Sequence, residues 1–194
     1  FDIFKGNKRI LLFLFKTNII IPNESILKII TNDKYSKMFY PEYFFQEFNI
    51  ENHDNENIDI EQFELKRKIG ENDSYICQLL RNDSVIDFIK YTSKNNISLS
   101  SKISPSIFET NPTILKQNPT LIQYSAFYGA IQIFRYIIMN YVDLEPSLWI
   151  YAIHSNNPEM IHFLEDLRVI PNDPAYKDCY KEAIKCHHNE IMNY

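Results

Sequence analysis

The sequence repeats a short pattern three times after residue 120, with a period of about thirty residues. The pattern runs over residues 120–137, returns over 147–164 and returns again over 178–192. Each copy divides into two short segments in which apolar residues have helical spacing. A repeat this small cannot bury its own apolar face, so neighbouring repeats have to stack. We therefore expect an all-α fold that contains a solenoid of stacked helix pairs.

Each copy begins with a side chain that can accept hydrogen bonds from the free amides of a first helical turn. These capping positions are Thr120, Ser147 and Asp178. Gln123 stands three residues after the first of them, which is the spacing of a capping box. A residue that can adopt the left-handed conformation then ends each first helix. The expected ends are Gly129, Asn156 and His187. Asn157 and Pro158 predict the start of one second helix.

Apolar and small residues at i, i+3 and i+4 predict which face of each first helix meets its neighbours. They are Ile122, Ser125, Ala126, Trp149, Ala152, Ile153, Tyr180, Ala183 and Ile184. Helical geometry then fixes the residues on the opposite side. That side carries Tyr124, Phe127, Tyr128, Tyr151, His154, Ser155, Glu182, Lys185 and Cys186.

These residues resemble the ankyrin repeat, whose pattern is Thr-Pro-Leu-His-x-Ala-Ala-x-x-Gly followed by a second helix of Glu-Ile-Val-x-Leu-Leu type. Thr120, Ala126 and Gly129 occupy the Thr, second Ala and Gly positions. The Glu-Ile position is taken by Gln132-Ile133, Glu159-Met160 and Glu190-Ile191. The resemblance covers residues 120–194 and implies a protein-binding solenoid.

The sequence also departs from the ankyrin pattern. Leu121 replaces the Pro, Gln123 replaces the His, and the Gly occurs in one copy only. Ile153 follows Ala126 by 27 residues, whereas the family period is about 33. The β-hairpin finger between these two repeats is therefore expected to be trimmed or absent.

A divergent copy precedes the others. Asp73, Leu79 and Asn82 stand where the later copies have their cap, small residue and helix end. The expected layout is a divergent helical region over 1–72 and ankyrin-like repeats over 73–194. The repeats fall at 73–91, 120–140, 147–166 and 178–194, with an insert at 92–119 that contains short helical turns.

The whole layout resembles a protist class of ankyrin proteins, in which a helical segment of uncharacterised function precedes the repeats. The stretches that carry this resemblance are Tyr40-Pro41-Glu42, Arg81-Asn82-Asp83-Ser84 and Pro105-Ser106-Ile107-Phe108-Glu109. The chain begins at Phe1 and stops inside a predicted helix at Tyr194, so we expect it to be part of a longer protein.

The N-terminal region contains an apolar run, Ile10–Phe15, flanked by Lys8, Arg9 and Lys16. A membrane-spanning helix needs about 20 apolar residues, so this run predicts a buried helix. A second helix is expected after a cap at Asn23 or Ser25, and a short aromatic helix over 39–48.

Eight acidic residues and no Lys or Arg occupy residues 42–64. The part near 51–64 predicts a solvated acidic loop. A calcium loop is the alternative, but no glycine stands at the turn, and the twelfth residue counted from Asp54 is not acidic. The basic run Lys66–Lys68 is expected to pair with these acids rather than with nucleic acid.

No catalytic constellation emerges. Glycine occurs only at positions 6, 70 and 129, which rules out a glycine-rich phosphate loop. The best metal candidates, Cys179, Cys186, His187 and His188, do not have zinc spacing, and the last three would point in different directions on a helix. We therefore expect no catalytic residue, no metal and no cofactor. Three cysteines, an odd number, favour free thiols in a reducing compartment and an intracellular, cytoplasmic protein.

The formal net charge of −5 argues against nucleic acid as the partner. The predicted partner-binding surface is the side of the first helices opposite the stack, where tyrosine is a common binding residue. Its residues are Tyr124, Phe127, Tyr128, Tyr151, His154, Ser155, Glu182 and Lys185. The alternative is that the insert or further repeats cover these rings. The expected function is a monomeric protein–protein interaction scaffold; a regulatory or targeting module of a larger enzyme is the alternative.

Overall fold

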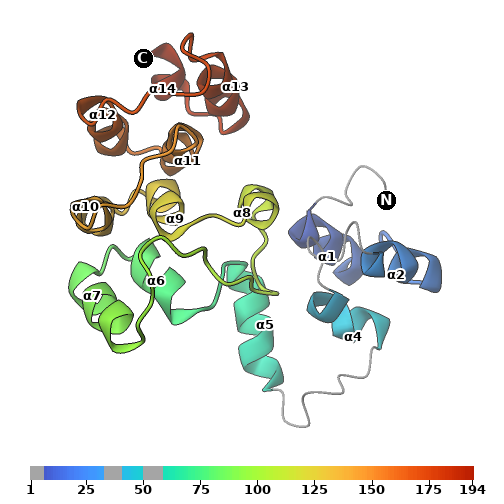
Figure 1. Cartoon of the computed structure of the whole chain (residues 1–194). Coiled ribbons are helices and arrows are strands. Elements are labelled where there is room, and N and C mark those ends of the chain that lie inside the picture. Colours follow the sequence, from blue (N-terminus) through green and yellow to red (C-terminus); the bar gives the residue numbers. More distant parts are fainter. Residues whose placement is uncertain (1–6, 33–40, 50–58) are drawn as a thin grey trace. The chain divides into compact units, whose positions relative to one another are not determined.

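The computed structural model describes residues 7–32, 41–49 and 59–194 of the chain (Figure 1). Within these ranges the regular elements are all helices, apart from one isolated antiparallel bridge between Lys102 and Thr120. The expected all-α class is confirmed. Among the helices described, none combines the length and the apolar character needed to cross a bilayer.

The chain divides into two compact units that are interleaved in sequence. Unit 1 comprises residues 1–74 and 104–118, and unit 2 comprises residues 75–103 and 119–194. The segment 92–119, expected to be a single insert in the repeats, is thus split between them. Its second half belongs to unit 1, where the Thr110 hydroxyl donates to the Gly70 carbonyl at 2.7 Å and Ser104 O accepts from the Asn72 side chain, also at 2.7 Å.

Unit 1 is built from short helices around an aromatic core. The helices are α1 (Lys8–Lys16), α2 (Glu24–Thr31), the 3-10 helix η1 (Pro41–Phe44), α4 (Phe45–Phe48), α5 (Ile60–Ile69) and α8 (Pro112–Gln117). Of the two caps predicted for α2, Asn23 is the one observed, and it accepts a hydrogen bond from Ile26 N. The apolar run predicted to be buried supplies Leu11, Leu12 and Phe15, and Phe15 packs edge-on against Phe44.

The acidic run lies only partly within the described residues. Glu51–Asn57 falls outside them, and so do Phe39 and Tyr40 of the aromatic stretch. Residues 60–64 belong to α5 rather than to a loop, and Asp59 caps that helix through Gln62 N. The predicted pairing between the acidic and basic runs is present, because Arg67 contacts Glu47 at 2.6 Å and Glu64 at 3.3 Å.

Unit 2 consists of four consecutive helix pairs (Figure 1). They are α6 (Tyr75–Arg81) with α7 (Val85–Lys94), α9 (Leu121–Tyr128) with α10 (Ile131–Met139), α11 (Leu148–Ser155) with α12 (Pro158–Asp166), and α13 (Lys177–Lys185) with α14 (Asn189–Asn193). Each first helix packs against the first helix of the next pair, in the order α6, α9, α11, α13. We call these four helices the first-helix row.

The predicted helix ends agree with the structure in most places. Gly129, Asn156 and His187 all have positive φ and follow their helices, and Thr120 forms the predicted capping box with Gln123. Ser147 precedes α11 but makes no capping hydrogen bond with its side chain. Asp178 is not a cap, because α13 begins one residue earlier.

Two other predictions for unit 2 are wrong. The residue with positive φ between α6 and α7 is Asp83, not Asn82. In the last pair, Tyr180 and Ile184 are 52% and 46% exposed instead of facing the stack. Ala183 is buried as predicted, but the other buried residue is Cys179, so the buried face of α13 is shifted from the predicted one by about one residue.

Asp83 connects the first pair to the second. Its carboxylate accepts hydrogen bonds from Gln132 N at 3.0 Å and Ile133 N at 2.9 Å, at the start of α10. The residue in the cap position of α10, Ala130, has no side chain that can do this. The first pair therefore supplies the cap of a helix in the second, and the negative charge also suits the positive end of the helix dipole.

We expect Asp83→Ala to destabilise unit 2 by about 1 to 2 kcal/mol, because two amides at the start of α10 lose their acceptor. The measurement is urea unfolding followed by circular dichroism. Asp87→Ala is the matched control, since Asp87 is exposed on α7 and forms a long ion pair with the exposed Lys90. Equal losses in the two variants would contradict the capping role.

Candidate functional site

The predicted partner-binding residues lie on the first-helix row, but they are not equally accessible. Tyr124, Phe127 and Tyr151 are buried, with exposures of 0%, 8% and 4%. The other members are at least partly accessible: Tyr128, His154, Ser155 and Glu182 are half-buried, and Lys185 is exposed. The accessible part of the surface is therefore smaller than the helical pattern suggests.

Tyr124 is held inside the row by polar and aromatic contacts. Its hydroxyl accepts a hydrogen bond from Arg81 Nη1 of α6 at 2.8 Å, and its ring lies 4.8 Å from that of Tyr128. The Arg81 guanidinium also stands over the Tyr128 ring, 5.9 Å from its centre. Burial raises the pKa of Tyr124 well above its ordinary value, so the phenol stays neutral. These contacts join the first pair to the second.

We expect Tyr124→Phe to destabilise unit 2 by about 1.5 to 3 kcal/mol, because it removes the acceptor of a hydrogen bond from a charged donor. Urea unfolding measures the loss. Tyr141→Phe serves as the control, since the Tyr141 side chain is 96% exposed. A Tyr124→Phe variant as stable as this control would show that the Arg81 contact contributes nothing.

Further along the row, three polar side chains meet between α11 and α13. His154 Nε2 lies 3.0 Å from Glu182 Oε1, and His154 Nδ1 lies 3.4 Å from Cys186 Sγ. The other oxygen of Glu182 accepts from Lys185 Nζ at 2.7 Å. The Phe127 ring stacks on the imidazole at a centroid distance of 4.8 Å. We call His154, Glu182 and Cys186 the His–Glu–Cys cluster.

Partial burial sets the protonation of this cluster. Burial lowers the pKa of His154, while the charge and hydrogen bond of Glu182 oppose the shift and nearby His188 adds to it. Burial raises the pKa of Cys186, and the negative charge of Glu182 raises it further. At neutral pH the imidazole is therefore neutral and the thiol is protonated.

The order thiol, imidazole, carboxylate is that of a nucleophile, its base and an orienting group. A reactive cysteine, however, needs a pKa below its ordinary value so that the thiolate is populated. The raised pKa of Cys186 disfavours that form. Imidazole, carboxylate and thiol are also all common ligands of divalent metals.

The structure groups the metal candidates differently from the sequence analysis. Of Cys179, Cys186, His187 and His188, only Cys186 joins a set of three whose donor atoms lie close together, among the residues described. Cys179 is buried on α13, and His187 is exposed. His154 and Glu182 supply the other donors. All three lie on the side of the first helices opposite the predicted stacking face, and this shared side was the signal that could have found them.

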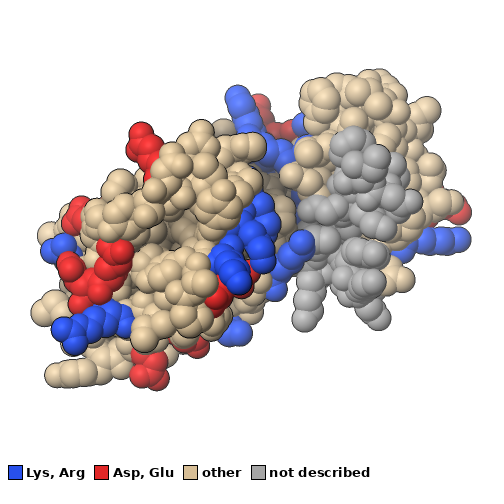
Figure 2. Space-filling view, turned by 90° about the horizontal axis from the view of Figure 1, so that it is seen from above, with Lys and Arg blue, Asp and Glu red and all other residues tan. Residues whose placement is uncertain are grey.

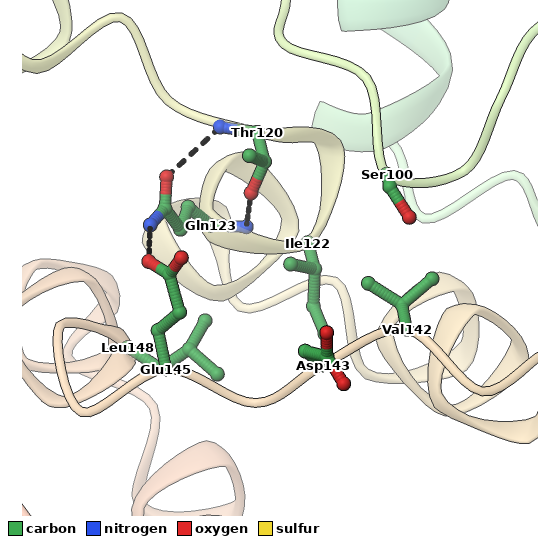
Figure 3. A pocket seen from close by; sticks show the side chains of 8 residues that line it. All are labelled: Ser100, Thr120, Ile122, Gln123, Val142, Asp143, Glu145 and Leu148. Carbon is green, nitrogen blue, oxygen red and sulfur yellow. Dashed lines mark hydrogen bonds between the residues drawn. The ribbon is translucent and has the colours of Figure 1, made fainter.

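A small polar hollow lies on the side of the row where α9 begins (Figure 3). The Gln123 side chain accepts from Thr120 N at 2.9 Å and donates to Glu145 Oε2 at 3.0 Å. Its amide nitrogen also donates to Ser147 Oγ at 3.0 Å, so this residue joins the second pair to the third. The hollow measures about 140 Å³, which suits a few water molecules but is small for an organic ligand.

A larger hollow of about 960 Å³ lies between the third and fourth pairs. Its walls are mostly apolar, and their residues include Trp149, Ile153, Ile161, Tyr180, Ile191 and Met192. Trp149 is fixed there by a hydrogen bond from its Nε1 to Val169 O at 2.6 Å. Tyr180, which is 52% exposed, lines this hollow.

Fold and site together define an all-helical protein with a row of packed helix pairs and a polar cluster between the last two. Comparison with protein-family models, with curated proteins and with solved structures gave no match to this chain. The functional argument therefore depends on the geometry and on the residues themselves.

Proposed function

We propose that this chain is a non-catalytic protein-binding module built on ankyrin-like helix pairs. The observation that carries the proposal is the order of contacts in unit 2, where four helix pairs follow one another and their first helices pack in sequence. Arrays of this kind present an extended surface to partners. The likeness of residues 120–194 to ankyrin repeats supports the same function.

The proposed contact surface is the accessible part of the first-helix row. It comprises Tyr128, His154, Ser155, Glu182 and Lys185. The buried Tyr124, Phe127 and Tyr151 lie on the same helices and hold them in register rather than touching the partner. Partner specificity would then come from a few polar groups on a fixed helical scaffold.

Charge favours a protein as the partner. Acidic and basic side chains are interspersed on the face drawn in Figure 2, and neither sign covers it. The net charge of the chain is −5. A nucleic-acid partner would require a concentrated basic surface to neutralise phosphates.

The test is affinity capture from a lysate of the source cells, with captured proteins quantified by mass spectrometry. The variant Ser155→Arg, Lys185→Glu changes the proposed surface. The control Gln132→Arg, Lys90→Glu makes the same kinds of change at exposed positions of the second helices α10 and α7. We expect a protein that the parent and the control both capture and the variant loses. Equal capture by all three, or no capture by any, would contradict the proposal.

A further inference from the structure

The His–Glu–Cys cluster brings together donor atoms from two helix pairs. His154 comes from α11, Glu182 from α13, and Cys186 follows α13 directly. The side chains of His154 and Glu182 are 15% and 14% exposed, so most of their surface is shielded from water. Shielding strengthens the interaction of such groups with an ion, because fewer water molecules compete for it.

The spacing of the donor atoms suits a zinc ion. The three atoms all lie within 4.8 Å of one another, and Cys186 Sγ lies 4.0 Å from His154 Nε2. Bond lengths of about 2.0 to 2.3 Å place two ligands of tetrahedral zinc about 3.3 to 3.8 Å apart. Small rotations of the side chains are enough to reach these separations.

Neighbouring residues already orient the first ligands. Phe127 stacks on the imidazole and fixes the plane of the His154 ring. Lys185 holds Glu182 Oε2, which leaves Oε1 directed toward the imidazole. Partners that orient ligands in this way raise metal affinity, because less freedom is lost on binding.

His188 provides a separate observation beside the cluster. Its Nδ1 is buried and has no hydrogen-bond partner among the residues that the structure describes, and the ring lies within electrostatic range of His154. The positive φ of His187 turns the chain between Cys186 and His188, so the two are not on one continuous helix. A buried ring nitrogen without a partner is uncommon, but His188 is not among the donors that lie within 4.8 Å of one another, so the described residues supply three ligands.

We propose that His154, Glu182 and Cys186 form a zinc-binding site that ties the third helix pair to the fourth. Binding replaces the S–H bond of Cys186 with a zinc–sulfur bond and releases the proton to solvent. Imidazole binds through its neutral nitrogen and Glu182 through one carboxylate oxygen. The inference goes beyond the proposed partner binding and does not depend on it.

The test is a zinc titration of the metal-free full chain in competition with a chromophoric chelator. We expect one zinc ion per chain. Cys186→Ala and His154→Gln should each weaken binding by at least about 100-fold, more than the loss of an outer partner costs. Cys179→Ala is the matched control from the same region and should bind as the parent does.

Cobalt provides a second measurement that does not depend on affinity. Co²⁺ bound through a thiolate gives a sulfur-to-metal charge-transfer band in the near ultraviolet. We expect this band in the parent and in Cys179→Ala, and its loss in Cys186→Ala, with equal helix content by circular dichroism. Absence of stoichiometric zinc binding, or a charge-transfer band that survives in Cys186→Ala, would overturn the proposal.

Discussion

Replacing Arg67 with methionine is expected to destabilise unit 1 by about 3 to 5 kcal/mol, because it leaves a buried carboxylate without its partner. The Arg67 side chain is 1% exposed and contacts Glu47 Oε1 at 2.6 Å, and that glutamate side chain is only 11% exposed. The guanidinium also lies over the rings of Tyr43 and Phe63. The loss of unfolding free energy can be measured by thermal and urea unfolding. Amide hydrogen exchange in α1 and α5 would assign that loss to unit 1.

Two further variants distinguish the loss of the ion pair from the loss of side-chain packing. Lys68→Met changes an exposed cation on the same helix and should cost less than about 0.5 kcal/mol. The double variant Arg67→Met, Glu47→Leu should recover most of the loss, because replacing both members of a buried pair by apolar groups is often close to neutral. Within the described part of the chain, Arg67 Nε and Glu47 Oε2 are buried without hydrogen-bond partners, which supports this expectation. An Arg67→Met variant as stable as the parent would contradict the predicted loss.

The stability of unit 1 is expected to rise by about 3 to 4 kcal/mol between pH 7 and pH 10 because of Lys8. This lysine is 1% exposed, and its Nζ donates to Ile107 O at 2.8 Å. Burial lowers its pKa from 10.5 to about 7, although Glu109 and Glu42 oppose the shift. Above pH 7 the folded state has lost the proton and the unfolded state keeps it. Stability then rises by about 1.4 kcal/mol per pH unit until the unfolded lysine titrates.

The measurement is the unfolding free energy of unit 1 as a function of pH in the parent and in Lys8→Met. The variant should lack the rise, since a methionine does not titrate. Lys16→Met is the matched control at the other end of α1, where the lysine side chain is 48% exposed and pairs with Glu64. Parallel pH profiles in the parent and Lys8→Met would show that Lys8 keeps its ordinary pKa.

Features of the fold that depend on neighbours in sequence could be predicted. The capping box at Thr120, the left-handed residues at Gly129 and Asn156, and the helix start at Pro158 all follow from local backbone chemistry. The hydrogen bond from Thr110 to Gly70 joins residues 40 positions apart, and no periodic pattern indicates it. For the same reason, the split of the insert between the two units could not be predicted.

The candidate site was predictable in part. Helical geometry placed His154, Glu182 and Cys186 on one side of the first helices, and the structure brings all three together. The metal candidates considered in the sequence were close to one another along the chain, whereas stacked repeats join residues about one period apart. The burial of Tyr124 could not be predicted, because periodicity identifies two faces of a helix without saying whether both are covered.

The interleaving of the two units limits how this protein can be cut or recombined. Residues 104–118 complete unit 1 but stand between two segments of unit 2. A fragment beginning at residue 75 would carry these residues away from Gly70 and Asn72, which bind them. Neither unit could therefore be exchanged between proteins as one contiguous piece of gene. A recombination event that kept both units intact would have to move residues 1–194 together.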